Sequence, residues 1–435
     1  MKETVDFGVR LRRPERSQLG WEPRCADDLV GADHPVRSVA AVVEKLDLSK
    51  FYKSIKAREG VSGRDSTDPG LLVSLWLYGC VRGVGSAREL ARRCEESAAF
   101  RWLCGGVTVN HRLLSDFRTD HGAALDALFT QVIASLVDQD IVKVSRISQD
   151  GVRVRVSAGA SSFRREERLK ELLQQAEEHV KQLHQQVDGG VASKLSAREK
   201  GARKKAAEDR KKRLEKAVAQ LPELKEKQAK AEQRAGEGTQ GEKVRQRQPR
   251  VSTTYPEARR MKMPNGGFNP AVNVQLATDT ESRVIVGVDV TFEGTDSVGL
   301  SAPMRKQVEK RTRKKVQQHL IDGGYMRKED IENAGEVEIF MPPKVARLPA
   351  NRGKELEPKK GDSPAILRWK KRMASEQGKE IYKERASTSE TVNADLRTYR
   401  GLSQITVRGS AKIKCVALWC ALAYNVFRYA HKLLA

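Results

Sequence analysis

Ser148-Gln-Asp-Gly151 lies between two segments in which apolar and charged or polar residues alternate, and this stretch decides the fold. Ile141-Val-Lys-Val-Ser-Arg-Ile147 precedes it, and Val152-Arg-Val-Arg-Val156 follows it. Alternation with a period of two is typical of β-strands. Asp-Gly is a common turn sequence. The simplest prediction is a strand, a polar tip at Asp150-Gly151 and a returning strand.

The residues before this stretch, 1–140, predict an all-α N-terminal domain. Asp68-Pro69 offers an N-cap followed by proline at the first helical position. Ser86-Ala-Arg-Glu89 reads as a capping box that starts a helix from Ala87 to about Trp102. A third long helix is expected from about His111 to Val137, with one broad apolar face. The arginines of this region could face DNA or only solvent, and the sequence leaves both open.

Residues 163–250 predict an antiparallel coiled-coil insertion. Apolar residues recur at helical spacing from Leu169 to Val187 and again from Leu214 to Ala231, with Gly189-Gly190 between them. Ser196-Ala-Arg-Glu199 is a further capping box, and a polar linker is expected from Gly236 to about Pro249. Residues 164–250 contain 24 basic and 15 acidic residues. The insertion could be a solvated spacer or an arm that touches DNA.

The remainder of the chain returns to an α/β pattern. Strands are expected at Asn269–Ala277, Arg283–Val290 and Val337–Met341, and a basic helix at about Leu300–His319. A short buried strand should break at Asp322-Gly323-Gly324. From Leu367 onward the chain is expected to be helical, and the last helix, about Ala411–Leu433, is apolar nearly all round and should be buried.

Composition narrows the class of protein. The 435 residues carry 81 Lys+Arg against 57 Asp+Glu, a formal charge of +24, which favours a polyanionic partner such as nucleic acid. The longest apolar stretch, around Val416–Phe427, is too short to span a bilayer, and no secretory signal is expected. The six cysteines form no C-x-x-C pair and no zinc framework. A reduced, cytoplasmic protein is the expectation.

Three carboxylates are candidates for catalysis. Asp150 and Asp322 each stand beside glycine at a predicted strand end, and Glu390 lies on a predicted helix. Taken singly, the first two read as turn-forming residues and the third as an ordinary helical glutamate. Together they suit phosphodiester chemistry with two Mg²⁺ ions about 4 Å apart, because Mg²⁺ is a hard ion that prefers oxygen ligands.

Several motifs in order make the chain resemble the DDE transposases of bacterial insertion sequences, over roughly residues 30–430. The resemblance is to the branch with a helical N-terminal domain and a coiled-coil insertion after the first catalytic Asp. The segments that carry it are His34-Pro-Val-Arg37, Leu77-Tyr-Gly79 through Ser86-Ala-Arg-Glu89, Ser115-Asp-Phe-Arg118, Ser148-Gln-Asp-Gly151, Pro256-Glu-Ala-Arg259, Gly266-Gly267 with Asn273-Val-Gln275, Asp322-Gly-Gly-Tyr325, Tyr382 with Arg385, Glu390 and Arg397, Arg400-Gly-Leu402, and Arg408-Gly409.

The resemblance implies an α/β ribonuclease-H-like catalytic domain, a mixed five-stranded sheet flanked by helices. This domain would comprise residues 141–162 and 251–435. By resemblance, Asp150, Asp322 and Glu390 ligate two Mg²⁺ ions, with Mn²⁺ as a substitute, and Tyr382, Arg385 and Arg397 bind DNA. The chain departs from the family at four points: Arg397 replaces the usual Lys, four residues instead of three separate Arg385 from Glu390, Tyr255 replaces Asp, and Val156-Ser157 replaces an Ala/Asn-rich run.

The resemblance further implies a nucleoid-associated bacterial enzyme that binds the terminal inverted repeats of its own element. It would cleave DNA at the element ends and join the freed 3′-hydroxyl to target DNA. Double-stranded DNA is the expected partner, and a homo-oligomer is expected because two ends must be paired. The N-terminal helices would bind end sequence or support dimerisation. Three alternatives stay open: a nuclease of the same fold without strand transfer, a non-enzymatic DNA-binding protein, and an inactive copy that represses its relatives.

Overall fold

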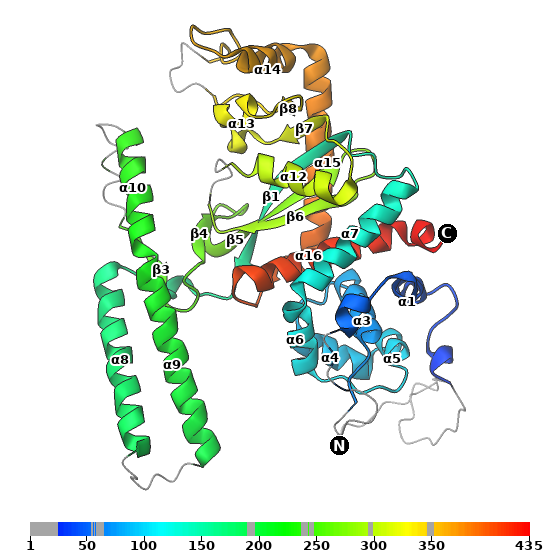
Figure 1. The fold of residues 1–435 in the computed structure, drawn as a ribbon, viewed down its shortest axis with the longest axis vertical. Helices are drawn as coiled ribbons and strands as arrows, with labels where there is room; N and C mark the ends of the chain where they lie inside the picture. The colour runs from blue at the N-terminus through cyan, green and yellow to red at the C-terminus, as the bar shows by residue number, and fades with distance from the viewer. Residues whose placement is uncertain are drawn as a thin grey trace, which may run out of the picture.

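The computed structural model describes residues 25–53, 55, 57, 65–188, 196–235, 242, 248–294, 299–345 and 352–435. Its centre is a mixed sheet of seven strands in the order β4-β5-β1-β7-β8, in which β6 also pairs with β5 and β9 with β1 (Figure 1). The sheet has seven strands instead of the expected five, because one edge of β5 and one edge of β1 each pair with two short strands. β4 pairs with the first part of β5 and β6 with the rest, while β7 and β9 pair with opposite ends of β1.

The predicted hairpin at Asp150-Gly151 is wrong, because β1 (Arg146–Val156) runs straight through both residues. β1 pairs antiparallel with β5 (Phe268–Asp279), and Gly151 lies opposite Gln275. The ladder gives the backbone at this point its hydrogen-bond partners, so the local turn tendency of Asp-Gly is overridden.

The strand predicted before Asp150, around residue 144, is also wrong. Asp140 and Val144 have positive φ angles of 57° and 50°, which no strand contains. Val142 and Val144 are nevertheless buried, and the backbone N–H of Val144 donates to the Asp279 carboxylate at 3.0 Å. The alternating apolar residues therefore report a buried connection, which a period of two cannot distinguish from a strand.

The N-terminal helices are shorter than predicted. The helix expected from Ala87 to Trp102 breaks at Ser97, which has extended backbone angles and both ends α4 and precedes α5. The helix expected from His111 to Val137 breaks at His121 into α6 and α7. The helix at Pro69 forms as predicted, with Asp68 as its N-cap. The helices of this region are η1 (Ala26–Leu29), α1 (Pro35–Lys45), α2 (Ser49–Tyr52), α3 (Pro69–Val81), α4 (Ala87–Glu96), α5 (Ala98–Cys104), α6 (His111–Asp120) and α7 (Gly122–Asp138).

The insertion contains two long helices side by side, α8 (Glu166–Asp188) and α9 (Ala197–Ala219), at a distance from the sheet (Figure 1). The second predicted helix divides at Gln220, after which α10 (Leu221–Ala235) begins. The Ser196–Glu199 capping box forms. η2 (Ala160–Ser162) lies before the insertion, and the strands β2 (Phe163–Arg164) and β3 (Val251–Ser252) close its base by pairing antiparallel. Gly189-Gly190 and most of the predicted linker lie outside the described residues.

The second half of the chain supplies the rest of the sheet and its covering helices. The basic helix is shorter than the predicted Leu300–His319, because Arg313 adopts a left-handed conformation that ends it. The strand expected to break at Asp322 does so. The elements are β4 (Arg259–Lys262), β6 (Ile285–Thr291), α12 (Ser301–Thr312), β7 (Gln318–Ile321), η3 (Gly323–Tyr325), α13 (Lys328–Glu332), β8 (Glu338–Phe340), α14 (Pro364–Ala374), α15 (Glu376–Tyr399), β9 (Gln404–Ile405) and α16 (Ser410–Leu434).

Helix α16 joins the N-terminal helices to the sheet. It contacts α1, α3, α6 and α7 and also packs along β6 (Figure 1). Its middle is fully buried, as predicted, and one hydrophobic core runs through all these elements. The buried Asn425 in this apolar helix accepts from Ile285 N–H at 3.0 Å and donates to Ile285 C=O at 2.8 Å. Its amide thus satisfies backbone groups of β6 that the sheet leaves unpaired.

A second core lies under β7, β8 and α14 and contains Ile321, Tyr325, Phe340 and Trp369. It supports the turn that follows β7. In the described part of the chain, no helix is both long enough and apolar enough to cross a membrane.

Candidate functional site

Asp150 and Asp322 come together through the parallel pairing of β1 with β7. The last paired residues of the two strands are Gln149 and Ile321, so each aspartate is the next residue on its strand. Because side chains alternate between faces, Asp150 and Asp322 point to the same face of the sheet. Asp150 was expected at a strand end; instead β1 continues, and it is β7 that stops there.

The sheet is open beside Asp150. β7 leaves β1 after Gln149, and β9 pairs with β1 only at Arg155 and Val156. The intervening stretch of β1, from Asp150 to Val154, therefore faces neither strand on this edge. At the neighbouring strand end, the Asp322 carboxylate accepts the backbone N–H of Gly324 at 3.2 Å, which turns the chain sharply away into η3.

Helix α15 brings Glu390 to the same face. It crosses β1, β7 and β8, and the buried hydroxyls of Ser148 and Ser389 lie 2.6 Å apart where it meets β1. Glu390 is the residue after Ser389, and its side chain is 71% exposed against 48% for Asp322 and 21% for Asp150. The exposure of the three carboxylates thus increases from Asp150 in the sheet to Glu390 on the helix.

One guanidinium connects all three carboxylates. Arg385 approaches Asp150 and Asp322 at 3.6 Å each and Glu390 at 3.8 Å. Its side chain is only 12% exposed, and its Nε atom is buried without a hydrogen-bond partner among the described residues. Because Arg385 and Asp150 are both mostly buried, their charge pair is screened less by solvent than the pair with the exposed Glu390. The site therefore concentrates negative charge and already accommodates a cation at its centre.

Tyr382 and Arg397 lie on α15, the helix that also carries Arg385 and Glu390. Tyr382 is half-buried one turn before Arg385. Burial raises the pKa of its hydroxyl to about 12, with Arg385 opposing the shift and Asp322 and Asp150 adding to it. It is therefore a neutral hydrogen-bond donor at physiological pH. Arg397 is exposed, seven residues after Glu390, which places both on the same side of α15.

Two groups of polar residues around the aspartates were missed from the sequence. The first is Asn393, whose amide donates to the Asp150 carboxylate at 3.1 Å. Its position eleven residues after Tyr382, on the face that holds Ser389, is a signal that helical periodicity could have given. The second is the buried pair Gln149 and Gln275, joined at 3.1 Å, with the Tyr325 hydroxyl donating to Gln275. These lie on the opposite face of the sheet, behind the aspartates.

The donor set suits a divalent cation of the Mg²⁺ type. All three candidate ligands offer carboxylate oxygens, and the cluster already draws a positive group among them. As arranged here, with Arg385 between them, the described His, Cys, Asp and Glu side chains include no three grouped closely enough to enclose one metal ion. Cation binding at this place would therefore displace the guanidinium.

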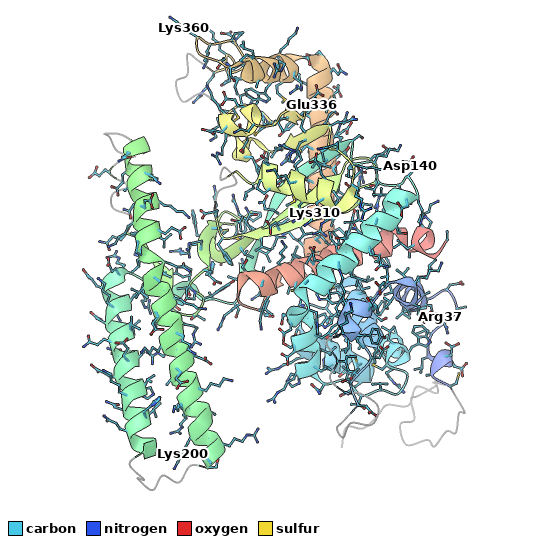
Figure 2. All side chains as sticks on the ribbon, viewed as in Figure 1. Arg37, Asp140, Lys200, Lys310, Glu336 and Lys360 are labelled. Atoms are coloured by element: carbon cyan, nitrogen blue, oxygen red, sulfur yellow. The ribbon has the colours of Figure 1, made fainter. Side chains whose placement is uncertain are left out.

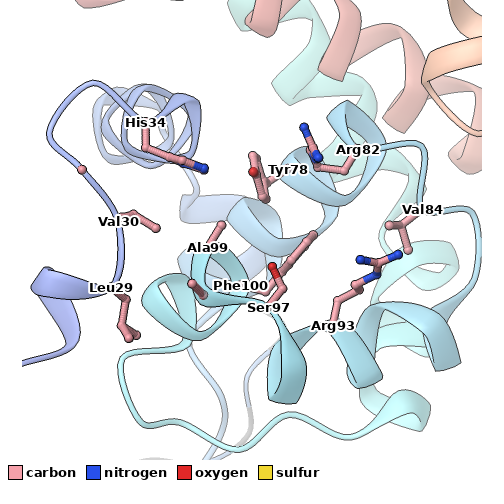
Figure 3. A pocket seen from close by; sticks show the side chains of 12 residues that line it. Leu29, Val30, His34, Tyr78, Arg82, Val84, Arg93, Ser97, Ala99 and Phe100 are labelled. Carbon is pink, nitrogen blue, oxygen red and sulfur yellow. The ribbon is translucent and has the colours of Figure 1, made fainter. Parts of the chain in front are cut away.

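The N-terminal helices contain a separate cavity of about 440 Å³. Figure 3 shows Arg82 and Arg93 on one side of it and Leu29 and Val30 on the other, with Tyr78 between them. It lies away from the carboxylates and contains none of the candidate catalytic residues.

Comparison with known families finds transposase sequences at both ends of the chain. Residues 24–120 match a transposase domain (DUF772), which covers helices η1 to α6. Residues 349–430 match a transposase DDE domain, which covers α14, α15 and most of α16. The second match includes Tyr382, Arg385, Glu390 and Arg397, whereas Asp150 and Asp322 lie outside both matches. No curated protein and no solved structure matches the chain.

An acidic site at the edge of a mixed sheet, together with a transposase DDE match on the helix beside it, defines an enzyme that acts on DNA. The two family matches go further than this class. Together they support a DDE transposase of an insertion sequence, and the helical N-terminal region and the mixed sheet flanked by helices are compatible with that family.

Proposed function

We propose that this transposase binds the terminal inverted repeats of its element, cleaves the DNA at the element ends and joins the freed 3′-hydroxyl to target DNA. One observation carries the proposal: side chains from β1, β7 and α15, distant in sequence, converge on a single cation at an open sheet edge. Structural ion pairs do not need three carboxylates on one guanidinium, whereas phosphodiester chemistry needs a concentrated acidic site.

Asp150, Asp322 and Glu390 would hold two divalent ions, Mg²⁺ or Mn²⁺. Such ions, when bound, activate the attacking oxygen and stabilise the leaving oxygen of a phosphodiester. Asn393 fixes the orientation of the Asp150 carboxylate through its 3.1 Å hydrogen bond. The proposal requires no covalent link between protein and DNA, so no serine or tyrosine acts as nucleophile.

Arg385 would exchange partners when DNA binds. In the structure its positive charge offsets the three carboxylates. Near the cut, a phosphate at the element end would offer the guanidinium a bidentate partner. This phosphate is negatively charged, like the carboxylates that the guanidinium would leave. Tyr382 would donate its hydroxyl to a neighbouring phosphate, since its raised pKa keeps it protonated. Arg397, which is exposed further along α15, would contact the phosphate backbone of the DNA.

The domain roles belong to the same proposal. Residues 141–162 and 251–435 would form a ribonuclease-H-like catalytic domain, which the mixed sheet with helices on it supports. Residues 1–140 would bind end sequence or support dimerisation, and residues 163–250 would be a coiled-coil insertion. A homo-oligomer would hold the two element ends together, because a single site cuts one end at a time.

The test uses the full-length protein, labelled duplexes with the element's own end sequence, and Mg²⁺. The wild type should give cleaved and joined products. Asp150→Asn, Asp322→Asn and Glu390→Gln should each reduce both products about a thousand-fold, equivalent to about 4 kcal/mol, without loss of DNA binding. Glu380→Gln, which removes an exposed carboxylate from the same helix, is the matched control and should remain active.

Two results would count against the proposal. Cleavage without any joined product would assign a nuclease of the same fold. Full cleavage by Asp322→Asn would mean that the aspartate is structural and that the chain acts on DNA in another way.

A further inference from the structure

The positive charge of the insertion is concentrated on one of its two long helices. Helix α9 carries ten Lys and Arg against four Asp and Glu, whereas α8 carries three basic residues against six acidic ones. The two helices contact each other along their length, and Figure 1 shows them side by side, projecting from the body. Helices α8 and α9 are called the arm below. Lys200 lies near its far end (Figure 2).

Four of the basic residues of α9 form a row along the helix. They are Arg198, Lys205, Lys212 and Lys216, separated by seven, seven and four residues, which are close to whole helical turns. All four are exposed. At 1.5 Å per residue the row is about 27 Å long. Asp209 lies in line with the row, while Glu208 and Glu215 at its margin approach His184 and Lys211 instead, so the row keeps a positive excess.

The row faces away from α8. Ala207 and Leu214, which are buried against α8, lie about half a turn from it. Within the described residues, none of the four cations forms an ion pair. By contrast, Lys225, Lys227 and Lys230 of α10 pair with Glu166, with Glu223 and Glu293, and with Glu226 respectively. These three lysines of α10 are therefore neutralised by nearby carboxylates, whereas the four residues of the row are not.

We propose that this row of α9 binds the phosphate backbone of duplex DNA, without regard to base sequence, as a second DNA-contacting surface distinct from the carboxylate site. A line of cations on a helix can neutralise several phosphates along a duplex, and each contact releases condensed counterions. Exposed lysines and arginines without carboxylate partners lose little when they make such contacts. The inference rests on the proposed function only in taking DNA as the polyanion.

The experiment measures DNA binding rather than catalysis. A fluorescein-labelled 30-base-pair duplex of arbitrary sequence is titrated with the full-length protein in EDTA, over a range of salt concentrations, and followed by anisotropy. Replacing all four residues of the row by Gln should lower the slope of log K against log salt by about 2 to 4 units. Affinity near physiological salt should fall at least about ten-fold. Lys205→Gln with Lys212→Gln should give about half the change in slope.

A matched control removes the same number of positive charges from the same insertion. Arg168→Gln, Lys225→Gln, Lys227→Gln and Lys230→Gln together eliminate four cations that already have carboxylate partners. This variant should keep most of the salt slope. Circular dichroism should show unchanged helix content in both sets, since exposed ion pairs contribute little stability.

The inference is overturned if the row variant and the control lower the slope equally, or if neither lowers it. The measurement needs no cleavage, so it is independent of the catalytic test. The two tests can therefore give different answers. If the row variant loses salt slope while Asp322→Asn cleaves fully, the proposed chemistry is wrong and the arm is still a DNA-binding surface.

Discussion

The guanidinium of Arg385 lies 3.6 Å from a carboxylate oxygen of Asp150, from a position that also reaches Asp322 and Glu390. These distances are those of charge pairs without the short, direct hydrogen bonds of a bidentate pair. The Nε atom of Arg385, which is buried without a hydrogen-bond partner among the described residues, is consistent with this geometry. Arg385 is therefore held by charge more than by fitted geometry, which suits a group that must leave when cations and DNA arrive.

Arg385→Gln should lower the thermal midpoint in metal-free buffer, because three neighbouring carboxylates lose their shared counter-charge. The midpoint should rise more with added Mn²⁺ than in the wild type. Apparent Mn²⁺ affinity should increase about three- to ten-fold, since the ion no longer displaces a bound cation. Thermal shift and calorimetric titration measure both effects.

Lys383→Gln is the control for this prediction, because Lys383 is an exposed cation on the same helix whose ion-pair partner among the described residues is Glu380. It should behave as the wild type does in Mn²⁺. An equal Mn²⁺ response in Arg385→Gln and the wild type would show that the guanidinium and the metal ions do not compete.

Asn393→Ala should weaken metal binding without affecting the fold. The amide of Asn393 holds one oxygen of Asp150, and such outer partners commonly change metal affinity about ten- to a hundred-fold. Calorimetric titration with Mn²⁺ gives the affinity, and Asn393→Gln should not restore it because the longer side chain misplaces the amide. Unchanged affinity in Asn393→Ala would mean that the other contacts of Asp150 are sufficient to orient it.

The sequence was enough to predict the strand that ends at Asp322, the strands β5 and β6 and the buried last helix, because each has a strong local pattern. It failed at Asp150-Gly151, where the local turn tendency and the long-range ladder to β5 disagree and the ladder prevails. It also failed at Ser97 and His121, where single residues with non-helical angles divide helices whose apolar periodicity continues.

The candidate site shows the same limit. Asp150, Asp322, Glu390 and Arg385 could be named from motif order, yet the place of Arg385 among the three carboxylates and the contact of Asn393 could not. The position of Arg385 between them depends on where α15 crosses β1, which the contact between Ser148 and Ser389 fixes. The register of Gln149 with Ile321, which sets the aspartates side by side, is likewise a property of strand pairing that no single segment contains.

His319 should make the protein less stable as the pH falls below about 6.5. It is fully buried on β7, and burial, with Arg305 nearby, lowers its pKa to about 3. The unfolded chain therefore takes up a proton between pH 6.5 and 3 that the folded protein does not, which costs about 2 kcal/mol at pH 5.

His319→Leu removes this term. Urea unfolding should show similar stability for variant and wild type at pH 8, and an advantage for the variant of about 2 kcal/mol at pH 5. No buried polar group is left unpaired by the change, because neither ring nitrogen has a hydrogen-bond partner among the described residues. Parallel pH profiles for the two proteins would refute the assignment of a neutral, buried imidazole.

Trp419→Ala should destabilise the N-terminal helices and the sheet together. Trp419 of α16 is 1% exposed, donates its indole N–H to the Arg118 backbone carbonyl at 3.1 Å and packs near Phe117. Because α16 also packs along β6, the cavity lies in a core shared by both regions, and a loss of about 3–5 kcal/mol is expected. Hydrogen exchange should accelerate in α3 and β6 alike. Trp102→Ala, at a partly exposed position of α5, is the control and should have a smaller and local effect. If exchange in Trp419→Ala accelerates in α3 alone, the N-terminal helices unfold independently of the sheet.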